Sequence, residues 1–349
     1  MMSKTKHRVL SGIRATGQLH LGNYFGAVKG MLALQDDPKF ETFYMVADAH
    51  AITTPYEVEA LGHNREAVIV DYLAAGLDPE KSVLFLQSDV PEHFELAFYF
   101  SSLTSVAKMQ HLPTFKDKVK QHPENVTMAL LNYPMLMAAD ILLYQADAVP
   151  VGIDQEPHLE VAREVARKFN ATYGSHLPEP QRFKTSGEYI PALSGEGKMS
   201  KSVPGSYINL SDDLTTIEKR VAKIPTDSGK GEIRELEAES DKHDDLLYFD
   251  QGKESKGVKT LLTLVELFSG ENLRRQYEVA YEGEGLRYGD IKKDLAQAIY
   301  QELKPIQARR AEILAQPDYV AQVIKTGQEK AQLVAKKTMI EVKSKLGLA

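Results

Sequence analysis

The sequence predicts an α/β fold, with a Rossmann-like, doubly wound parallel sheet followed by an all-helical C-terminal domain. In the first half of the chain, short apolar segments alternate with helical patterns, which is the order of βαβ units. The segment 82–89 is apolar on both faces, as a parallel strand between two helix layers is. From about residue 212 onward only helical periodicity remains. These three observations predict the fold class.

The composition is that of an ordinary globular chain. Of 349 residues, 43% are hydrophobic and 26% charged, enough for one large and one smaller domain. The chain has 42 Lys and Arg against 49 Asp and Glu, and its net charge of −7 disfavours nonspecific nucleic-acid binding but allows a local basic groove. No cysteine is present, which excludes disulfides, thiolate metal sites and cysteine nucleophiles.

Three features of the sequence bear on where the protein is located. The lack of cysteine agrees with a reducing cytoplasm. The start carries positive charge without an apolar core, so we expect no secretory leader. No apolar run approaches the roughly 20 residues that a membrane helix needs. We therefore expect a cytoplasmic protein.

Strands and helices are expected to alternate along the N-terminal domain. The expected strands are 8–12, 42–53, 82–89 and 148–152. The expected helices are 21–32, 57–77, 92–112, 134–145 and 155–170. Pro134 should lie near the first turn of its helix, where proline is tolerated.

The second half predicts a separate helical domain. Its helical periods cover 213–224, 257–268, 271–281, 290–302 and 317–346. The segment 226–247 is polar and heavily charged, and it should form a solvated loop or a short helix. We expect one domain at 1–210, a second at 211–310, and a C-terminal helix at 311–349 that packs back towards the first domain.

The segment TGQLHLGNY (16–24) lies between a predicted strand and a predicted helix. The free N–H groups and the positive dipole end of a helix start favour phosphate. His20 adds a donor there, and Gly22 leaves room for a nucleotide to approach the backbone. A capped strand–helix turn with a surface histidine explains the segment equally well. Neither a Walker loop nor G-x-G-x-x-G is present.

The segment SGEGKMSKSVPGS (194–206) places two lysines in a loop rich in glycine and serine. Lys198 and Lys201 are mobile charges that could follow a polyphosphate as its charge moves during a reaction. The hydroxyls of Ser200 and Ser202 can donate to phosphate oxygens. The alternative is a solvated lysine loop, which most short runs of lysine and serine are.

Together these two segments resemble a known family. H-L-G-N at 20–23 resembles the first signature of class I aminoacyl-tRNA synthetases, and K-M-S-K-S at 198–202 matches their second signature. The resemblance to bacterial tryptophanyl-tRNA synthetases covers nearly the whole chain, least clearly 226–256. It is carried by SGIRATGQLHLGNYFGAV (11–28), VADAHAIT (46–53), YPMLMAADILLYQADAVPVGIDQ (133–155) and AKKTMIEVKSKLGL (335–348).

The helix expected after Tyr133 can be interpreted physically. Tyr133, Met137, Asp140, Ile141 and Tyr144 share one helical face, which is apolar except for Asp140. A carboxylate on a buried apolar face needs a partner. That partner is either an Arg, a Lys or a backbone N–H in the core, or a flat apolar ligand with a single N–H. The resemblance implies the second, with Asp140 accepting from the indole N–H of tryptophan.

The resemblance implies the remaining site residues. The tryptophan-binding set is Gly12, His50, Tyr133, Met137, Asp140, Ile141 and Gln155. The ATP-binding set is Arg14, Ala15, Thr16, Gly22, Asn23, Gly152, Ile153, Asp154, Ile190, Lys198, Met199, Ser200, Lys201 and Ser202. The catalytic set is His20, Asn23, Lys198 and Lys201, with no protein-bound metal. His50 has the alternative of a satisfied core histidine.

Two positions depart from the family pattern. Asn23 stands where the tryptophan family often has histidine, and Arg14 stands where many bacterial relatives carry glutamine. Arg14 would lie by the bound nucleotide or by the amino-acid carboxylate, and it could alter how either is held.

The resemblance also implies an activity and partners. The chain would activate L-tryptophan with ATP and Mg²⁺, and then transfer it to tRNA(Trp). The helical domain would read the anticodon, and the family implies a homodimer. The basic stretch 108–122 could touch the acceptor stem, lie near a dimer contact or simply be a solvated face. Two alternatives remain: a synthetase-like auxiliary or regulatory protein that binds tryptophan and ATP, and another adenylate-forming or nucleotidyl-transfer enzyme of the same fold.

Overall fold

The structure is a computed structural model. It describes residues 6–152, 155–183, 190–201, 203–231, 233–235, 247–249 and 252–349. The chain forms two compact units. The first contains Met1–Gln18, Ala27–Glu188 and Arg310–Ala349, and the second contains Leu19–Gly26 and Tyr189–Arg309.

This division differs from the boundary expected at residue 210. Within the second unit, the Leu21 N–H donates to the Ile208 carbonyl and the Leu210 N–H to the Leu19 carbonyl, both at 2.9 Å. These backbone bonds tie residues near 20 to residues near 209, which are distant in sequence. The two motifs H-L-G-N and K-M-S-K-S therefore both belong to the second unit.

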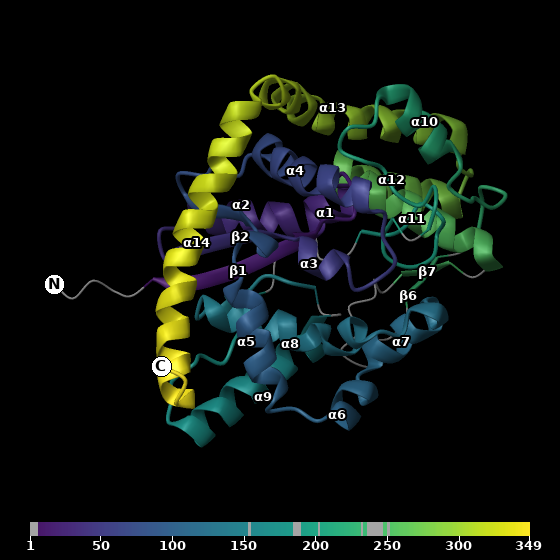
Figure 1. Cartoon of the computed structure of the whole chain (residues 1–349). Helices are drawn as coiled ribbons and strands as arrows, with labels where there is room; N and C mark the ends of the chain where they lie inside the picture. The colour runs from purple at the N-terminus through teal and green to yellow at the C-terminus, as the bar shows by residue number, and fades with distance from the viewer. Residues whose placement is uncertain are drawn as a thin grey trace. The chain divides into compact units, whose positions relative to one another are not determined.

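The first unit is built on a parallel sheet of five strands (Figure 1). Its strands are β1 (His7–Arg14), β2 (Phe40–Ala47), β3 (Ser82–Leu86), β4 (Ala148–Val149) and β5 (Gln181–Arg182). They lie in the order β3-β2-β1-β4-β5, and every neighbouring pair is parallel. This order confirms the doubly wound sheet. It also puts the point where the strand order reverses between β1 and β4, where ligands bind in open α/β sheets.

Helices cover this sheet. Those of the first unit are α2 (Lys29–Asp36), α3 (Asp48–Ala51), α4 (Val58–Ala75), α5 (Glu92–Ser101), α6 (Val106–His111), α7 (Pro113–Gln121), α8 (Met128–Leu143), α9 (Glu156–Tyr173) and α14 (Pro317–Leu346), with the 3₁₀ turns η2 (Gln87–Asp89) and η3 (Pro123–Asn125). The expected strands after 42, 82 and 148 end earlier than predicted, because the chain turns into α3 at Asp48 and into η2 at Gln87. The helix expected at 92–112 is two helices, since the Ser105 hydroxyl caps a new start at α6.

The position expected for Pro134 is wrong. The Thr127 hydroxyl accepts from the Leu130 N–H at 3.2 Å, so α8 begins at Met128 and Pro134 lies inside the helix. Its ring nitrogen cannot donate to the Leu130 carbonyl, which loses its usual helical partner.

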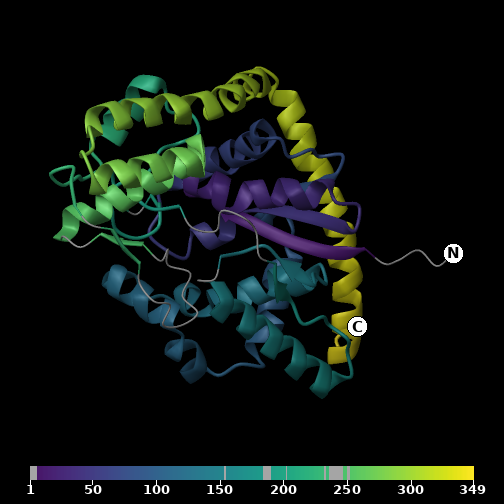
Figure 2. The same ribbon diagram turned by 180° about the vertical axis from the view of Figure 1, so that it is seen from behind.

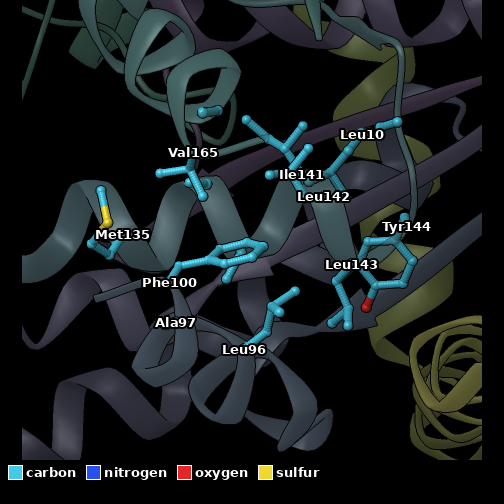
Figure 3. Packing of buried hydrophobic residues seen from close by; sticks show 14 of the residues in the cluster. Leu10, Leu96, Ala97, Phe100, Met135, Ile141, Leu142, Leu143, Tyr144 and Val165 are labelled. Atoms are coloured by element: carbon cyan, nitrogen blue, oxygen red, sulfur yellow. The ribbon is translucent and has the colours of Figure 1, made fainter. Parts of the chain in front are cut away.

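The core of the first unit surrounds α8. Figure 3 shows Met135, Ile141 and Leu143 of this helix with Phe100 of α5 and Val165 of α9 in one cluster of buried side chains. Burying a large aliphatic or aromatic side chain stabilises a fold by about 1.5–3 kcal/mol, so this cluster fixes α8 firmly. A helix whose backbone is fixed in this way can hold its polar side chains at defined positions.

Helix α14 covers the open edge of the sheet. It packs on β3, the edge strand, and a Cβ on Gly327 would lie 1.6 Å from the Leu84 carbonyl oxygen. Figure 2 shows α14, in yellow, beside the strands from the opposite side. The Gln328 and Gln332 amides donate to the Asp89 carbonyl at 3.1 and 2.8 Å. A covered edge is protected from pairing with another chain.

The second unit is mainly helical. It contains α1 (Leu21–Asn23), α10 (Leu214–Ala222), α11 (Gly252–Ser269), α12 (Glu271–Glu282) and most of α13 (Tyr288–Leu314), and the π-helical turn η1 (Tyr24–Val28) begins in it. Val258, Leu262 and Tyr281 form its buried cluster.

The segment 226–247 is only partly as predicted. An antiparallel pair joins β6 (Ile233–Glu235) to β7 (Leu247–Phe249), so the short-helix prediction is wrong for these residues. Residues 236–246 lie outside the described part of the chain. Before the pair, the Asp227 carboxylate accepts from the Tyr281 and Tyr288 hydroxyls at 2.5 and 2.6 Å, which ties this segment to the helices. Across the described parts of both units, no helix has both the length and the apolar character that crossing a membrane requires.

We expect Gly327→Ala to lower the free energy of unfolding by about 2 kcal/mol or more, because the added methyl group overlaps the Leu84 carbonyl. Gly62→Ala is the matched control: Gly62 lies within α4 with nothing within 4 Å, so alanine there should stabilise by up to about 1 kcal/mol. Urea unfolding of the two variants measures both effects. Equal midpoints for the two variants would contradict the packing described for α14.

Candidate functional site

A cavity of about 530 Å³ lies in the first unit, where the strands of the sheet end. Gly12 and Arg14 of β1, Ala47 of β2 and Val151 after β4 line it. All seven residues predicted to bind tryptophan also line it, namely Gly12, His50, Tyr133, Met137, Asp140, Ile141 and Gln155. A volume of this size suits a ligand of small-molecule dimensions.

Glycine is needed at position 12 of the cavity wall. Gly12 pairs with Met45 across β1 and β2. A Cβ at this position would lie 2.7 Å from Met45 Cγ and 2.8 Å from the Met45 carbonyl oxygen. Any other residue would push the two central strands apart.

Two carboxylates are among the described residues that line the cavity: Asp140 is fully buried, and Asp117 is exposed. The His93 Nδ1 lies 2.6 Å from its Oδ1, and the His50 Nε2 lies 2.8 Å from its Oδ2. The Gln87 amide donates to both oxygens, at 2.8 and 3.0 Å. The partners within the protein are therefore two imidazoles and an amide, rather than the Arg, Lys or backbone N–H considered from the sequence.

Second contacts hold two of these donors in place. The Gln87 Oε1 accepts from the His50 backbone N–H at 3.3 Å, which turns the Gln87 amide nitrogen towards Asp140. The His93 Nε2 is 2.9 Å from the Tyr144 hydroxyl. When that hydroxyl donates to Nε2, the proton of the neutral ring is on Nδ1, which then donates a hydrogen bond to Asp140. Sequence reasoning missed Gln87 and His93, because neither is near Asp140 in sequence.

The carboxyl group of Asp140 is ionised at neutral pH. Burial alone would raise its pKa, but the hydrogen bonds from His50 and His93 and their electrostatic influence lower the pKa of Asp140 to about 2. Burial and the Asp140 charge also raise the pKa of Tyr144 well above its ordinary value, so that hydroxyl keeps its proton. The cavity thus ends in a fixed negative charge.

Away from Asp140 the cavity lining is polar, and it contains two cationic side chains together with the exposed Asp117. The Tyr133 hydroxyl is 2.7 Å from the His158 Nε2, and the His158 Nδ1 is 3.0 Å from the Gln155 Oε1. Arg14 and Lys118 also line this cavity, and burial together with the Arg14 charge lowers the pKa of Lys118. Lys118 and His158 were not predicted as site residues, although Lys118 lies in the basic stretch noted at 108–122.

In the second unit, His20 and Asn23 cap the start of α1 reciprocally. The His20 Nδ1 accepts from the Asn23 N–H at 3.3 Å, and the Asn23 Oδ1 accepts from the His20 N–H at 3.2 Å. Because Nδ1 is an acceptor, the ring proton of neutral His20 is on Nε2. The imidazole can therefore donate from Nε2.

Met199 of the K-M-S-K-S segment packs directly on this helix start. Met199 is buried, and its N–H donates to the Ile190 carbonyl at 2.7 Å. A Cβ on Gly22 would lie 2.9 Å from the His20 ring and 3.1 Å from the Met199 carbonyl oxygen. Glycine at position 22 is thus what lets the two signatures approach each other.

The two signatures also interact electrostatically. Burial, and then the positive charges of Lys201 and Lys198, lower the pKa of His20 from 6.5 to about 4. At neutral pH the second unit therefore presents a neutral histidine beside two cations. Such a group suits phosphate oxygens, which accept hydrogen bonds and carry negative charge.

The structure brings together part of the predicted ATP-binding set. In the second unit it groups Gly22, Asn23, Ile190, Lys198, Met199, Ser200 and Lys201. In the first unit Arg14 lines the cavity, while Ala15, Thr16 and Gly152 follow β1 and β4 without lining it. Ile153, Asp154 and Ser202 lie outside the described residues. Within the described ranges, no group of three His, Cys, Asp or Glu side chains is arranged to hold a metal ion.

We expect the His20 ring to remain unprotonated as the pH falls from about 8 to about 5, and to titrate near pH 4. Between pH 6.5 and 4 the unfolded chain binds a proton that the folded chain does not. The free energy of unfolding should therefore decrease as the pH is lowered from 6.5 to 4. Proton NMR of the assigned His20 ring measures its titration.

Lys201→Ala should move the pKa of His20 upward but not to 6.5, because burial is the larger cause of the shift. Lys219→Ala on α10 is the control and should leave the His20 titration unchanged. A wild-type His20 that titrates near 6.5 would contradict this description of the site.

Comparisons with known proteins agree with the geometry. The family model of class I tRNA synthetases for tryptophan and tyrosine (W and Y) matches residues 2–304. "Tryptophan--tRNA ligase" of Porphyromonas gingivalis is 38% identical over 342 residues, which are 97% of this chain and 98% of that protein. The protein of the same name from Nostoc sp. is 40% identical over 349 residues, or 98% of each chain.

Solved structures are similar over the same length. A tryptophanyl-tRNA synthetase from Campylobacter jejuni, complexed with ADP and tryptophan, matches with a TM-score of 0.79 and 31% identity, covering 98% of this chain and 100% of that one. The enzyme from Mycoplasma pneumoniae matches with a TM-score of 0.81 and 31% identity, covering 99% of each. The family model and the relatives both span far more than half of the sequence, and the chain therefore belongs to the class I tRNA synthetases for tryptophan and tyrosine.

Proposed function

We propose that this chain acts as a tryptophan–tRNA ligase. It activates L-tryptophan with ATP to tryptophanyl-adenylate and pyrophosphate, and then transfers tryptophan to the 3′ end of tRNA(Trp). The observation that carries the proposal is the cavity of the first unit, which has a carboxylate at one end, cations at the other and apolar side chains between them.

The dimensions of the cavity suit tryptophan. Asp140 follows Tyr133 by seven residues on α8, which is about 10.5 Å along a helix axis. Met45, Met137, Ile141 and Val149 line the space as apolar side chains. A flat ring with one N–H can pair with Asp140, while the amino and carboxylate groups face Arg14, Tyr133 and Gln155. Phenylalanine has no ring donor, and tyrosine has one in a different place.

In the first step the tryptophan carboxylate attacks the α-phosphorus of ATP. The bond to the bridging oxygen breaks, and pyrophosphate leaves with the electron pair. No protein nucleophile is needed, so catalysis consists of positioning and of stabilising charge at the phosphates. The neutral His20 Nε2–H, Asn23, Lys198 and Lys201 would supply hydrogen bonds and positive charge there.

In the second step a ribose hydroxyl at the 3′ end of tRNA(Trp) attacks the activated carbonyl carbon, and AMP leaves. We assign anticodon reading to the helices of the second unit.

Mg²⁺ belongs to the proposal as a partner of the ATP phosphates. Mg²⁺ is usually bound through substrate phosphates and one or two carboxylates rather than by an all-protein cage. A cytoplasmic location completes the assignment, in line with a chain without cysteine.

Tryptophan-dependent exchange of pyrophosphate into ATP, followed by charging of purified tRNA(Trp), tests the proposal. Asp140→Asn keeps the shape of the side chain but replaces an acceptor by a donor, so we expect kcat/KM for tryptophan to fall by about 10²-fold or more. Asp36→Asn is the control, since Asp36 is an exposed carboxylate paired with Lys81, and its kinetics should match the wild type.

Near-normal kinetics of Asp140→Asn would refute the role of Asp140. Binding of tryptophan and ATP without charging of tRNA(Trp) would instead identify an auxiliary or regulatory protein.

A homodimer is also part of the proposal. On α5, Phe94 and Phe98 lie one helical turn apart with 43% and 75% of their surface exposed, and Met128 of α8 is 73% exposed. Phe94 and Phe98 form one exposed apolar stripe on α5, and we assign it to contact with a second copy of the chain. Light scattering should give twice the mass of one chain for the wild type. For Phe98→Glu the measured mass should shift towards that of a single chain. A wild-type monomer at micromolar concentration would contradict this assignment.

A further inference from the structure

The hydrogen bonds to Asp140 use nearly all of its accepting capacity. An ionised carboxylate offers about four lone-pair positions. His93 and Gln87 contact Oδ1 at 2.6 and 2.8 Å, and His50 and Gln87 contact Oδ2 at 2.8 and 3.0 Å. The Asp140 side chain is also only 1% exposed. A ligand N–H that approaches Asp140 from the cavity can therefore form a hydrogen bond only at a lone-pair position that one of these donors now occupies.

Two of the three donors are fixed. His93 and Gln87 are each 0% exposed, and neither lines the cavity. His93 is held at its other ring nitrogen by the Tyr144 hydroxyl, and Gln87 is held at its carbonyl oxygen by a backbone N–H. Moving either would break a second buried hydrogen bond, which costs about 1–3 kcal/mol for each group left unpaired.

His50 differs from both in its position. Its side chain is 11% exposed and it lines the cavity, so it is the donor that a ligand meets first. Among the described residues, its ring makes no hydrogen bond other than the one to Asp140. Its backbone is anchored independently, because the carbonyl accepts from the Thr53 hydroxyl at 2.8 Å and the N–H donates to Gln87. The imidazole can therefore rotate while the backbone stays in place.

We propose that His50 is the donor that tryptophan displaces: the ring N–H of the substrate takes the position on Oδ2 that the His50 Nε2 holds in this structure, while His93 and Gln87 stay. The inference rests on the proposed function and deepens it, because it assigns a separate role to each of the three donors around Asp140.

The exchange accounts for selectivity at a buried charge. A ring that reaches the end of the cavity moves the imidazole away from the carboxylate. If the ring carries an N–H, its hydrogen bond to the carboxylate replaces the one from His50, and the exchange changes the free energy little. If it carries none, as in phenylalanine, a buried carboxylate loses a donor without replacement, which is costly. His50 thus makes the site reject rings without a donor and keeps Asp140 paired before tryptophan arrives.

The test uses wild-type protein labelled with ¹⁵N-histidine, with the rings assigned through His50→Gln and His93→Gln. The chain contains no tryptophan, so the fluorescence of added tryptophan, excited above the tyrosine band, reports binding independently. At saturation we expect the His50 Nε2 proton to lose its protection from solvent exchange and its ¹⁵N signal to shift, while the His93 Nδ1 proton stays protected. Phenylalanine at the same concentration should change neither signal.

The possible outcomes separate the two proposals. If fluorescence shows binding and the His50 Nε2 proton stays protected, the exchange is overturned while the proposed function stands. If the His93 signal changes in place of that of His50, the assignment of the displaced donor is overturned. If fluorescence shows no binding of tryptophan at all, the proposed function fails, and the exchange fails with it.

Discussion

The buried negative charge of Asp140 is the constraint on which the first unit depends. An unpaired carboxylate in this position would cost several kcal/mol, so the fold must bring donors to it. They come from three elements, with His50 on α3, Gln87 on η2 and His93 on α5. Helices α3 and η2 follow the carboxyl ends of β2 and β3, and the strand order that places these ends together also places the cavity. The same arrangement therefore keeps the buried charge paired and holds an acceptor at the cavity wall.

At its site the second unit carries charge opposite in sign to that of Asp140. It holds a neutral imidazole, His20, beside two cations, Lys198 and Lys201, which suits an anionic substrate rather than an N–H donor. The close approach at Gly22 couples the two signatures physically, because the Met199 carbonyl lies where a larger side chain at position 22 would have to go. A change in the lysine loop will therefore also affect the helix start that carries His20, and the two segments form one structural element.

The sequence predicted much of this arrangement, for physical reasons that differ from residue to residue. The α8 face with Tyr133, Met137, Asp140 and Ile141 was predictable because helical spacing alone places those side chains together. The partners Gln87 and His93 were not, since they reach Asp140 from 53 and 47 residues away and no local pattern marks them. The apolar run does not mark the start of α8, because the helix begins six residues before Pro134, at Met128, where the Thr127 hydroxyl caps it.

The central claim is that a buried carboxylate selects a ring by its single N–H. The most direct measurement compares the dissociation constants of tryptophan and of its analogue in which a sulfur atom replaces the ring N–H, with the analogue measured by competition against tryptophan fluorescence. The two ligands have nearly the same shape, so they differ chiefly in the donor. The account predicts that the analogue binds at least about 10²-fold more weakly, because it displaces His50 from the buried charge without supplying a hydrogen bond in its place. Equal affinity of the two ligands would contradict it.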